Sequence, residues 1–252
     1  MYIFQISDLH FQAEDERSAN NLDKVVKSIA AQDVKPDLLL ITGDITHGQK
    51  YDSYPQVFEK IKSLGVPFLC ITGNNDSSSG LMKALQEFVP AHPHSEMADY
   101  LQYGVDTYPC RIIALDSFAP GNLSGALDDK RLAWFEEKLN NNPSHKPTLV
   151  MIHQFTLPNT LHRGFLPWFA EFNHLISDHQ QDIRLVVSGH LHASLGGLIC
   201  KTRFISAPST NWNSIFDFNN HGNQIRDNSA PVGYLIHHFD GNDFISYHVA
   251  LA

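Results

Sequence analysis

The chain has 252 residues, of which 42% are hydrophobic and 18% are charged, as in an ordinary soluble globular protein. That length allows one large α/β domain or two small ones. The formal net charge of −9 argues against a nucleic-acid polymer as the main partner, because phosphate backbones bind basic surfaces.

Histidine is unusually frequent, with 15 residues against 18 for lysine and arginine together. Imidazole is the commonest metal ligand in proteins, although most of these histidines are expected to be ordinary surface or partly buried residues. The widely spaced Cys70, Cys110 and Cys200 predict reduced thiols in a cytoplasmic protein. No signal peptide is expected at the N-terminus, and no apolar run is long enough for a membrane helix.

The first part of the chain alternates strands and helices. Leu22, Val25 and Ile29 lie at helical spacing, which predicts a helix from Ser18 onward. Strands are expected over 2–7, 36–44 and 66–76, and a second helix over 54–65. This β-α-β-α-β order predicts a largely parallel sheet, in which ligands collect outside the carboxyl ends of the strands. All three strands end in polar residues, within the segments SDLH, GDIT and GNND.

The pattern continues and then changes near the end of the chain. Helices are expected over 81–89, 128–142 and 165–179, and strands over 107–117, 146–153 and 183–192. Beyond them, the segments 195–209 and 231–251 are typical of antiparallel strands, the second with a turn at 240–242. Because no linker or repeat interrupts the chain, we predict one domain over residues 1–252.

Eight polar residues lie at the ends of five predicted strands: Asp8, His10, Asp44, Asn74, Asp76, His153, His190 and His192. Any one of them alone is more often a structural loop residue than a ligand. Together, imidazoles, carboxylates and a carboxamide oxygen favour a divalent cation such as Mn²⁺, Fe²⁺ or Zn²⁺. The set contains no cysteine, which argues against a purely structural zinc site. Seven ligands are too many for one tetrahedral metal but suit two metals that share a carboxylate, an arrangement that can hold a phosphoryl group.

The ordered motifs Asp8-x-His10, Gly43-Asp44, Gly73-Asn74-x-Asp76, His153 and Gly189-His190-x-His192 resemble those of the calcineurin-like metallophosphoesterases. Within that superfamily the chain is most similar to the bacterial class III cyclic nucleotide (cAMP) phosphodiesterases. The segments that carry this closer likeness are IALDS (113–117), GNLSGALDDKRLAWFEEKL (121–139) and APST (207–210). The resemblance implies an α/β fold, namely a four-layer α/β/β/α sandwich of two mixed β-sheets.

The resemblance also implies a ligand set for two divalent ions, with Mn²⁺ or Fe²⁺ favoured and Zn²⁺ possible. One ion would be held by Asp8, His10, Asp44 and His192. The other would be held by Asp44, Asn74, His153 and His190, so that Asp44 bridges. The implied reaction is hydrolysis of a small phosphodiester, most plausibly a 3',5'-cyclic nucleotide, through attack by a hydroxide that bridges the metals.

Other functions remain open from the residues alone. They are a phosphomonoesterase, a nucleotide pyrophosphatase, and a metal-binding pseudoenzyme with attenuated catalysis. The expected partner is a small nucleotide-like phosphoester, with no nucleic-acid polymer and no membrane. Relatives in the superfamily are often dimers, which makes a homodimer an expectation as well.

Asn75 departs from the resemblance, because most relatives carry histidine there. An amide can donate a hydrogen bond to a phosphoryl oxygen, but it cannot transfer a proton as imidazolium does. Three hypotheses follow: Asn75 is an oxyanion donor, another histidine such as His47 or His221 supplies the proton, or catalysis is weak. Asp76 is expected to orient a metal ligand, or else to cap the following helix.

Further candidates flank the motifs. Asn211 and Trp212 follow APST and are expected to bind the base or alcohol of the substrate, although Trp212 could equally serve packing. Weaker candidates for the wall of the cleft follow His153: Phe155, Leu157 and His162.

Overall fold

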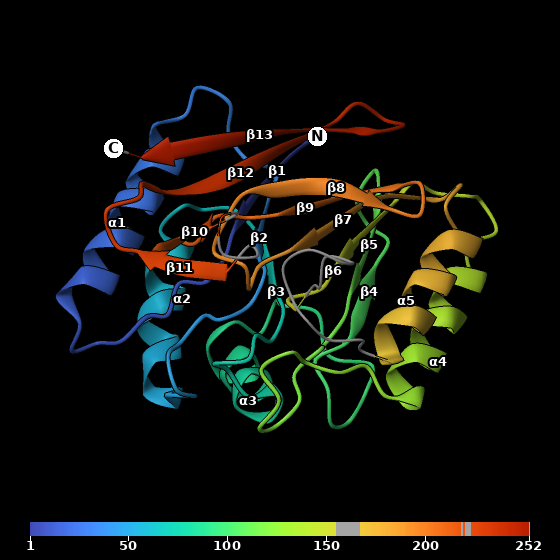
Figure 1. The fold of residues 1–252 in the computed structure, drawn as a ribbon, viewed down its shortest axis with the longest axis horizontal. Coiled ribbons are helices and arrows are strands. Elements are labelled where there is room, and N and C mark those ends of the chain that lie inside the picture. The colour runs from blue at the N-terminus through green and yellow to red at the C-terminus, as the bar shows by residue number, and fades with distance from the viewer. Residues whose placement is uncertain (155–166, 218, 220–222, 252) are drawn as a thin grey trace.

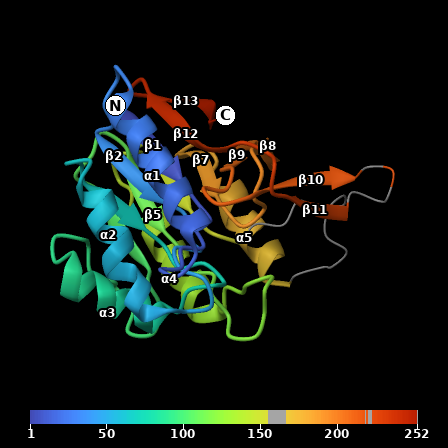
Figure 2. The same ribbon diagram turned by 90° about the vertical axis from the view of Figure 1, so that its left-hand side faces the viewer.

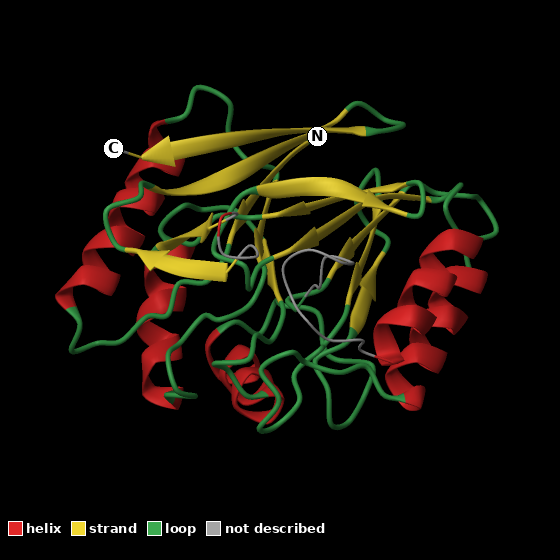
Figure 3. Ribbon diagram, viewed as in Figure 1, coloured by secondary structure: helices red, strands yellow, loops and turns green. Residues whose placement is uncertain are grey.

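Two mixed β-sheets pack face to face between two outer layers of helices in the computed structural model (Figures 1 and 3). The structure describes residues 1–154, 167–217, 219 and 223–251. This arrangement confirms the four-layer α/β/β/α sandwich that the resemblance implies. The candidates Phe155, Leu157, His162 and His221 lie outside the described residues.

The first sheet has the strand order β13-β12-β1-β2-β3. Its first three strands along the chain run parallel, and the C-terminal hairpin adds two antiparallel strands beside β1. The strands are β1 (Tyr2–Ile6), β2 (Leu38–Ile41), β3 (Phe68–Cys70), β12 (Val232–Phe239) and β13 (Phe244–Leu251). The three helices that precede β4 are α1 (Glu16–Ala31), α2 (Tyr54–Lys62) and α3 (Ser78–Phe88), with a 3₁₀ turn, η1 (Tyr51–Ser53), before α2.

Helix α1 shows why these segments are helical. The Asp15 side chain accepts a hydrogen bond from the Arg17 backbone N–H at the first turn, so the helix has a capped start. Leu22, Val25 and Ile29 recur on one face and are fully buried in the core of the first sheet.

The second sheet has the order β4-β5-β6-β7-β9-β8. Its strands are β4 (Tyr103–Val105), β5 (Arg111–Ala114), β6 (Thr148–Met151), β7 (Ile183–Ser188), β8 (Leu195–Ile199) and β9 (Thr202–Ser206). The outer helices on this side are α4 (Asp129–Asn140) and α5 (Pro167–Asp178). Strands β5, β6, β7 and β9 are parallel, whereas β4 and β8 are antiparallel edge strands.

Alternation along β6 divides the hydrophobic core into two layers. Leu149 and Met151 belong to the large cluster that fills the space between the sheets. Val150 and Ile152 point the other way, into the cluster shared with α4 and α5. All four side chains are completely buried, as expected for a parallel strand that is covered on both faces.

Most predicted elements are present, with ends shifted by a few residues. The strand expected over 107–117 is shorter, and the segment 195–209 forms a β8–β9 hairpin whose second strand also pairs parallel with β7. The sequence did not predict β4, which has only three residues, or the separate hairpin of β10 (Asn213–Asp217) and β11 (Asn223–Asp227), whose strands contain many polar residues. Figure 2 shows that this hairpin extends from the body of the sandwich.

None of the helices in the described ranges has the length and apolar character needed to cross a membrane.

Candidate metal centre

The loops that follow β1 and β2 leave the sheet side by side. The backbone N–H of Asp8 donates to the Gly43 carbonyl (3.1 Å), and the N–H of His10 donates to the Asp44 carbonyl (2.9 Å). Gly43 itself has a φ of 89°, and a Cβ there would come within 2.4 Å of the His153 ring. Glycine is therefore required at Gly43, which directly precedes the ligand candidate Asp44.

Five of the predicted ligands have left-handed backbone conformations, which L-residues rarely adopt. These are Asp8, His10, Asp44, His190 and His192, with φ angles of 52°, 43°, 50°, 69° and 50°. Each such residue costs about 1–3 kcal/mol and persists only where the surrounding structure holds it. Backbone strain therefore gathers at the strand ends that carry the candidate ligands.

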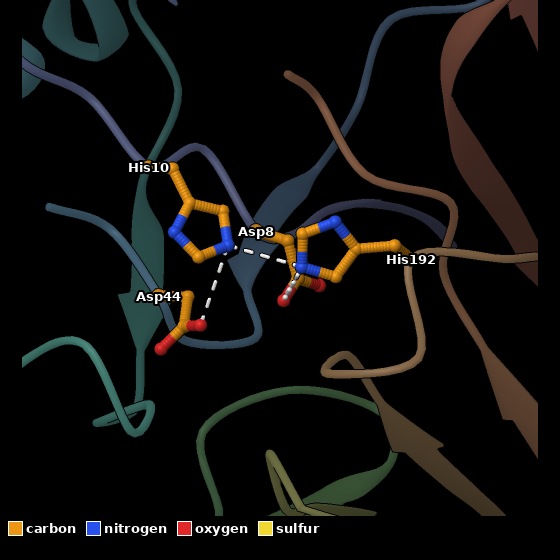
Figure 4. A group of neighbouring side chains, drawn as sticks. All are labelled: Asp8, His10, Asp44 and His192. Carbon is orange, nitrogen blue, oxygen red and sulfur yellow. Dashed lines mark hydrogen bonds and ion pairs between the residues drawn. The ribbon is translucent and has the colours of Figure 1, made fainter. Parts of the chain in front are cut away.

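The first group of donors consists of Asp8, His10, Asp44 and His192, all buried, with one ligand atom from each lying within 4.8 Å of the others. The Nε2 atom of His10 lies 3.0 Å from Nε2 of His192 and 3.4 Å from Oδ2 of Asp44. Nε2 of His192 lies 3.2 Å from Oδ1 of Asp8. Figure 4 shows the four side chains pointing toward one another.

The second group lies on the other side of Asp44. The side-chain oxygen of Asn74 is 3.2 Å from Nε2 of His153 and 2.8 Å from Nδ1 of His190. Nε2 of His153 is also 3.5 Å from Oδ1 of Asp44. The Asp44 carboxylate thus presents Oδ2 to the first group and Oδ1 to the second.

Two of the imidazoles are oriented by backbone carbonyls. Nδ1 of His153 lies 2.6 Å from the Thr42 carbonyl, and Nδ1 of His192 lies 2.9 Å from the Trp212 carbonyl. A carbonyl only accepts, so Nδ1 carries the proton in both rings. In the neutral form of each ring, Nε2 then has the lone pair on the side that faces the carboxylates, as in metal-binding histidines.

The electrostatics also suit bound cations. Burial lowers the pKa of His10 to about 4 and that of His190 to about 3, so both imidazoles are neutral at pH 7 and able to bind a metal. Burial alone would raise the pKa of Asp44, but His153 and His10 hold that pKa well below its usual range. Burial opposes protonation of His153, yet Asp44 raises its pKa to about 9. The space between these two side chains thus favours positive charge.

Asn75 lies against the carboxylate that faces both groups. Its side-chain Nδ2 donates to Oδ2 of Asp44 (2.8 Å), and its backbone N–H donates to Oδ1 (2.7 Å). Asn75 also lines the cavity at the centre. An amide has two N–H groups, so one remains for another acceptor.

Asp76 is fully buried and does not line the cavity. Its carboxylate accepts hydrogen bonds from the backbone N–H groups of Ile45 and Thr46, both at 3.1 Å, and so holds the loop that follows Asp44. Ser77, and not Asp76, caps the next helix. Burial and the charge of Asp44 raise the pKa of Asp76 to about 6.

The remaining candidates take different places. Trp212 lines the cavity and its ring packs on His192, with centroids 3.7 Å apart. Asn211 is buried and is not among the cavity-lining residues. Nδ1 of His47 lies 3.3 Å from Nδ1 of His10, on the side of that ring away from Asp44.

The cavity has a volume of about 300 Å³ and includes residues that the sequence analysis did not single out. Its wall is completed by Ser214, Gln224 and Arg226, all from the β10–β11 hairpin. The local sequence signal for this hairpin is the alternation of polar and apolar residues in Gln224-Ile225-Arg226. Three residues are too few to distinguish a strand from a loop.

Residues 1–194 match the sequence model of the calcineurin-like phosphoesterases. A probable glycerophosphodiester phosphodiesterase of Arcobacter nitrofigilis is 33% identical over 159 residues, which are 61% of this chain but only 57% of the relative. A probable cyclic nucleotide phosphodiesterase of a Synechococcus species is 30% identical over 215 residues, 82% of this chain and 80% of the relative. A dimetal phosphatase from Danio rerio has the same fold, with a TM-score of 0.70 at 13% identity over 98% of each chain.

Proposed function

Because the chain belongs to the calcineurin-like phosphoesterase family, we propose that it hydrolyses a small phosphodiester, with a 3',5'-cyclic nucleotide as the substrate. The membership confirms the resemblance drawn from the ordered motifs, and the family is one of dimetal-dependent hydrolases. The observation that carries the proposal is the Asp44 carboxylate, whose two oxygens face two separate groups of nitrogen and oxygen donors. A carboxylate in that arrangement suits a bridging ligand between two ions.

The donors fit two divalent cations of intermediate hardness, such as Mn²⁺ or Fe²⁺. Asp8, His10 and His192 would complete one site with Asp44, while Asn74, His153 and His190 would complete the other. When bound, the ions would neutralise charge on the phosphoryl group and lower the pKa of a water molecule so that it can act as the nucleophile.

The residues of the chain bind and orient the phosphodiester. Asn75 uses one amide N–H to hold Asp44, and the second N–H is suited to donate to a phosphoryl oxygen as negative charge builds there. An amide cannot protonate the leaving alcohol. We therefore expect rates to depend strongly on the leaving group, with activated phenolate esters cleaved faster than alkyl esters.

The substrate class rests on the relatives and on the cavity. The Synechococcus relative, which matches over most of both chains, is described as a probable cyclic nucleotide phosphodiesterase. The Arcobacter relative is described as a probable glycerophosphodiester phosphodiesterase, which makes a glycerol diester the second candidate. A cavity of about 300 Å³ beside the donors is an ordinary size for a small-ligand site.

The test is Mn²⁺-dependent hydrolysis of bis(p-nitrophenyl) phosphate, cyclic AMP, cyclic GMP and glycerophosphocholine by the purified chain. Activity should appear with Mn²⁺, disappear with a chelator and return when Mn²⁺ is restored. Asp44→Asn should be inactive on every substrate. If the manganese-loaded chain cleaves no diester, the proposed activity is wrong. If it cleaves only glycerophosphocholine, the second candidate is correct.

A further inference from the structure

The β10–β11 hairpin presents different chemistry on its two faces. Ser214 pairs with Arg226 across the strands, and both line the cavity. The next pair, Ile215 and Ile225, points to the other face, where the side chains are 51% and 44% exposed. Its polar face is therefore turned toward the metal centre, which is what a ligand-binding wall requires.

Hydrogen bonds connect this wall to the loop that carries two of the candidate ligands. The backbone N–H of Ser214 donates to the His192 carbonyl (2.8 Å). Nε2 of Gln224 donates to the Leu191 carbonyl (2.9 Å) and to the Ser214 hydroxyl (2.8 Å). These contacts fix the hairpin that carries Arg226 against the ligand loop.

Arg226 is held with its donors free. Its guanidinium lies over the Trp212 ring, 4.4 Å from the centroid, and its Nε donates to Oδ1 of Asn228 (2.9 Å). The two terminal nitrogens have no hydrogen bond or ion pair within the ranges that the structure describes. The result is an oriented pair of N–H donors on the wall of a cavity, in a chain whose formal net charge is −9.

We propose that Arg226 is a specificity-determining residue that binds two adjacent acceptor atoms on the base of a nucleotide substrate and thereby selects guanine over adenine. The inference rests on the proposed function, because the phosphoryl group would occupy the metal centre and direct the rest of the nucleotide to the hairpin wall. A guanidinium donates two parallel hydrogen bonds, and guanine offers N7 and O6 as neighbouring acceptors. Adenine has an amino group beside N7, so one N–H donor of Arg226 would face another donor instead of an acceptor.

The direct test is equilibrium binding of GMP and of AMP to the manganese-loaded protein, measured by calorimetry. We expect the wild type to bind GMP more tightly by about 5- to 150-fold. Arg226→Gln should remove the preference for GMP, because a carboxamide pairs with N7 and the amino group of adenine, whereas Arg226→Lys, whose ammonium can still donate to N7 and O6, should keep part of it. Arg203→Gln, which removes an exposed arginine paired with Asp243 outside the cavity, should keep the wild-type ratio.

A wild-type ratio close to one would overturn the inference, and so would an unchanged preference in both Arg226 variants. The ratio of kcat/KM for cyclic GMP to kcat/KM for cyclic AMP is a second measurement of the same preference. The two proposals fail separately. Guanine selectivity in binding without diester hydrolysis would overturn the proposed activity and support the role of Arg226, whereas hydrolysis without base selectivity would do the opposite.

Discussion

The side-chain amide of Asn75 donates to Oδ2 of Asp44 across 2.8 Å, and the backbone N–H of the same residue donates to Oδ1 across 2.7 Å. One residue therefore orients both oxygens of the carboxylate that faces the two donor groups. This geometry gives the asparagine at this position two contacts with a candidate metal ligand. It also separates two functions for Asn75, orientation of Asp44 and donation to the substrate, which variants can distinguish.

Substitution of Asn75 should change metal binding and leaving-group dependence in different ways. Asn75→Ala removes the side-chain donor to Oδ2 of Asp44 but keeps the backbone N–H donor to Oδ1, and it should weaken metal affinity by about 10- to 100-fold, the usual effect of losing a side chain that orients a metal ligand. Asn75→His supplies a group able to protonate the alcohol, and the rate on cyclic AMP should rise by up to about 10²-fold relative to bis(p-nitrophenyl) phosphate. Steady-state kinetics on both substrates measure this ratio. An unchanged ratio for Asn75→His would show that proton transfer to the leaving group does not limit the rate.

Metal content should follow the two donor groups. We expect two ions per chain in the wild type and one in His10→Ala, because that substitution removes a donor from only the first group. Asp44→Asn should lower occupancy at both sites, since the carboxylate faces both. Elemental analysis after dialysis against Mn²⁺ gives the stoichiometry. His238→Ala is the matched control, because His238 stacks on Tyr2 in the first sheet, away from the centre. Equal metal loss in His10→Ala and Asp44→Asn would contradict the bridging role.

Gly189 should tolerate no side chain. A Cβ there would lie 2.0 Å from the Ser7 hydroxyl and 2.7 Å from Oδ2 of Asp8. Gly189→Ala should therefore displace Asp8 and reduce metal binding and activity together. In Gly197→Ala the added methyl group meets nothing within 4 Å, so both quantities should stay at the wild-type level. Wild-type metal affinity in Gly189→Ala would show that the Asp8 loop can adapt.

Asp76→Asn should destabilise the fold even though the two side chains have almost the same size. The buried carboxylate accepts from the backbone N–H groups of Ile45 and Thr46, and an amide leaves at least one of them without a partner. The expected loss in the free energy of unfolding is about 1–3 kcal/mol, measured by urea denaturation. Asp240→Asn, in an exposed turn where the carboxylate also accepts backbone N–H groups, should cost less than half as much. Equal losses in the two variants would show that burial of Asp76 does not set the cost.

His237 should make the protein acid-sensitive at a point away from the metal centre. The ring is fully buried between Gln5 and Ser246, and burial lowers its pKa to about 3. The unfolded chain takes up a proton on this histidine near pH 6.5, whereas the folded chain does so only near pH 3. The contribution of neutral His237 to the free energy of unfolding is therefore fully present above pH 6.5 and is lost as the pH falls from 6.5 toward 3. The stability advantage of the wild type over His237→Gln should therefore shrink by about 2 kcal/mol between pH 7.5 and pH 5.

Comparing the two proteins at each pH cancels the titration of the metal ligands, which they share. Urea denaturation in constant Mn²⁺ measures the difference. A difference that stays constant over this range would mean that His237 does not contribute to the acid sensitivity.

Much of the centre was predictable because it depends on local sequence. Apolar runs such as LLLI and TLVM form buried strands wherever they occur in an α/β chain, and the residue types at their carboxyl ends can be read directly. Parallel order brings those ends to one edge. Asp8 and Asp44 were therefore expected to lie close together, and their loops do run side by side.

The part of the cavity wall that comes from the β10–β11 hairpin could not be predicted, because its place depends on contacts between distant segments. Strands β10 and β11 have little apolar patterning of their own, and contacts with Leu191 and His192 hold them beside the cavity. The same holds for Asn75, whose partner Asp44 is 31 residues away in sequence.

The sequence by itself determined most of the strands, the parallel order of the first three and the chemical types of the candidate ligands, because hydrophobic periodicity and motif order are local properties. Only the tertiary structure decided that each oxygen of Asp44 faces a different donor group, that Asn75 binds this carboxylate, and that Arg226 reaches the cavity. These are contacts between segments distant in sequence. Packing and hydrogen bonding across the folded chain select them, and no local pattern encodes them.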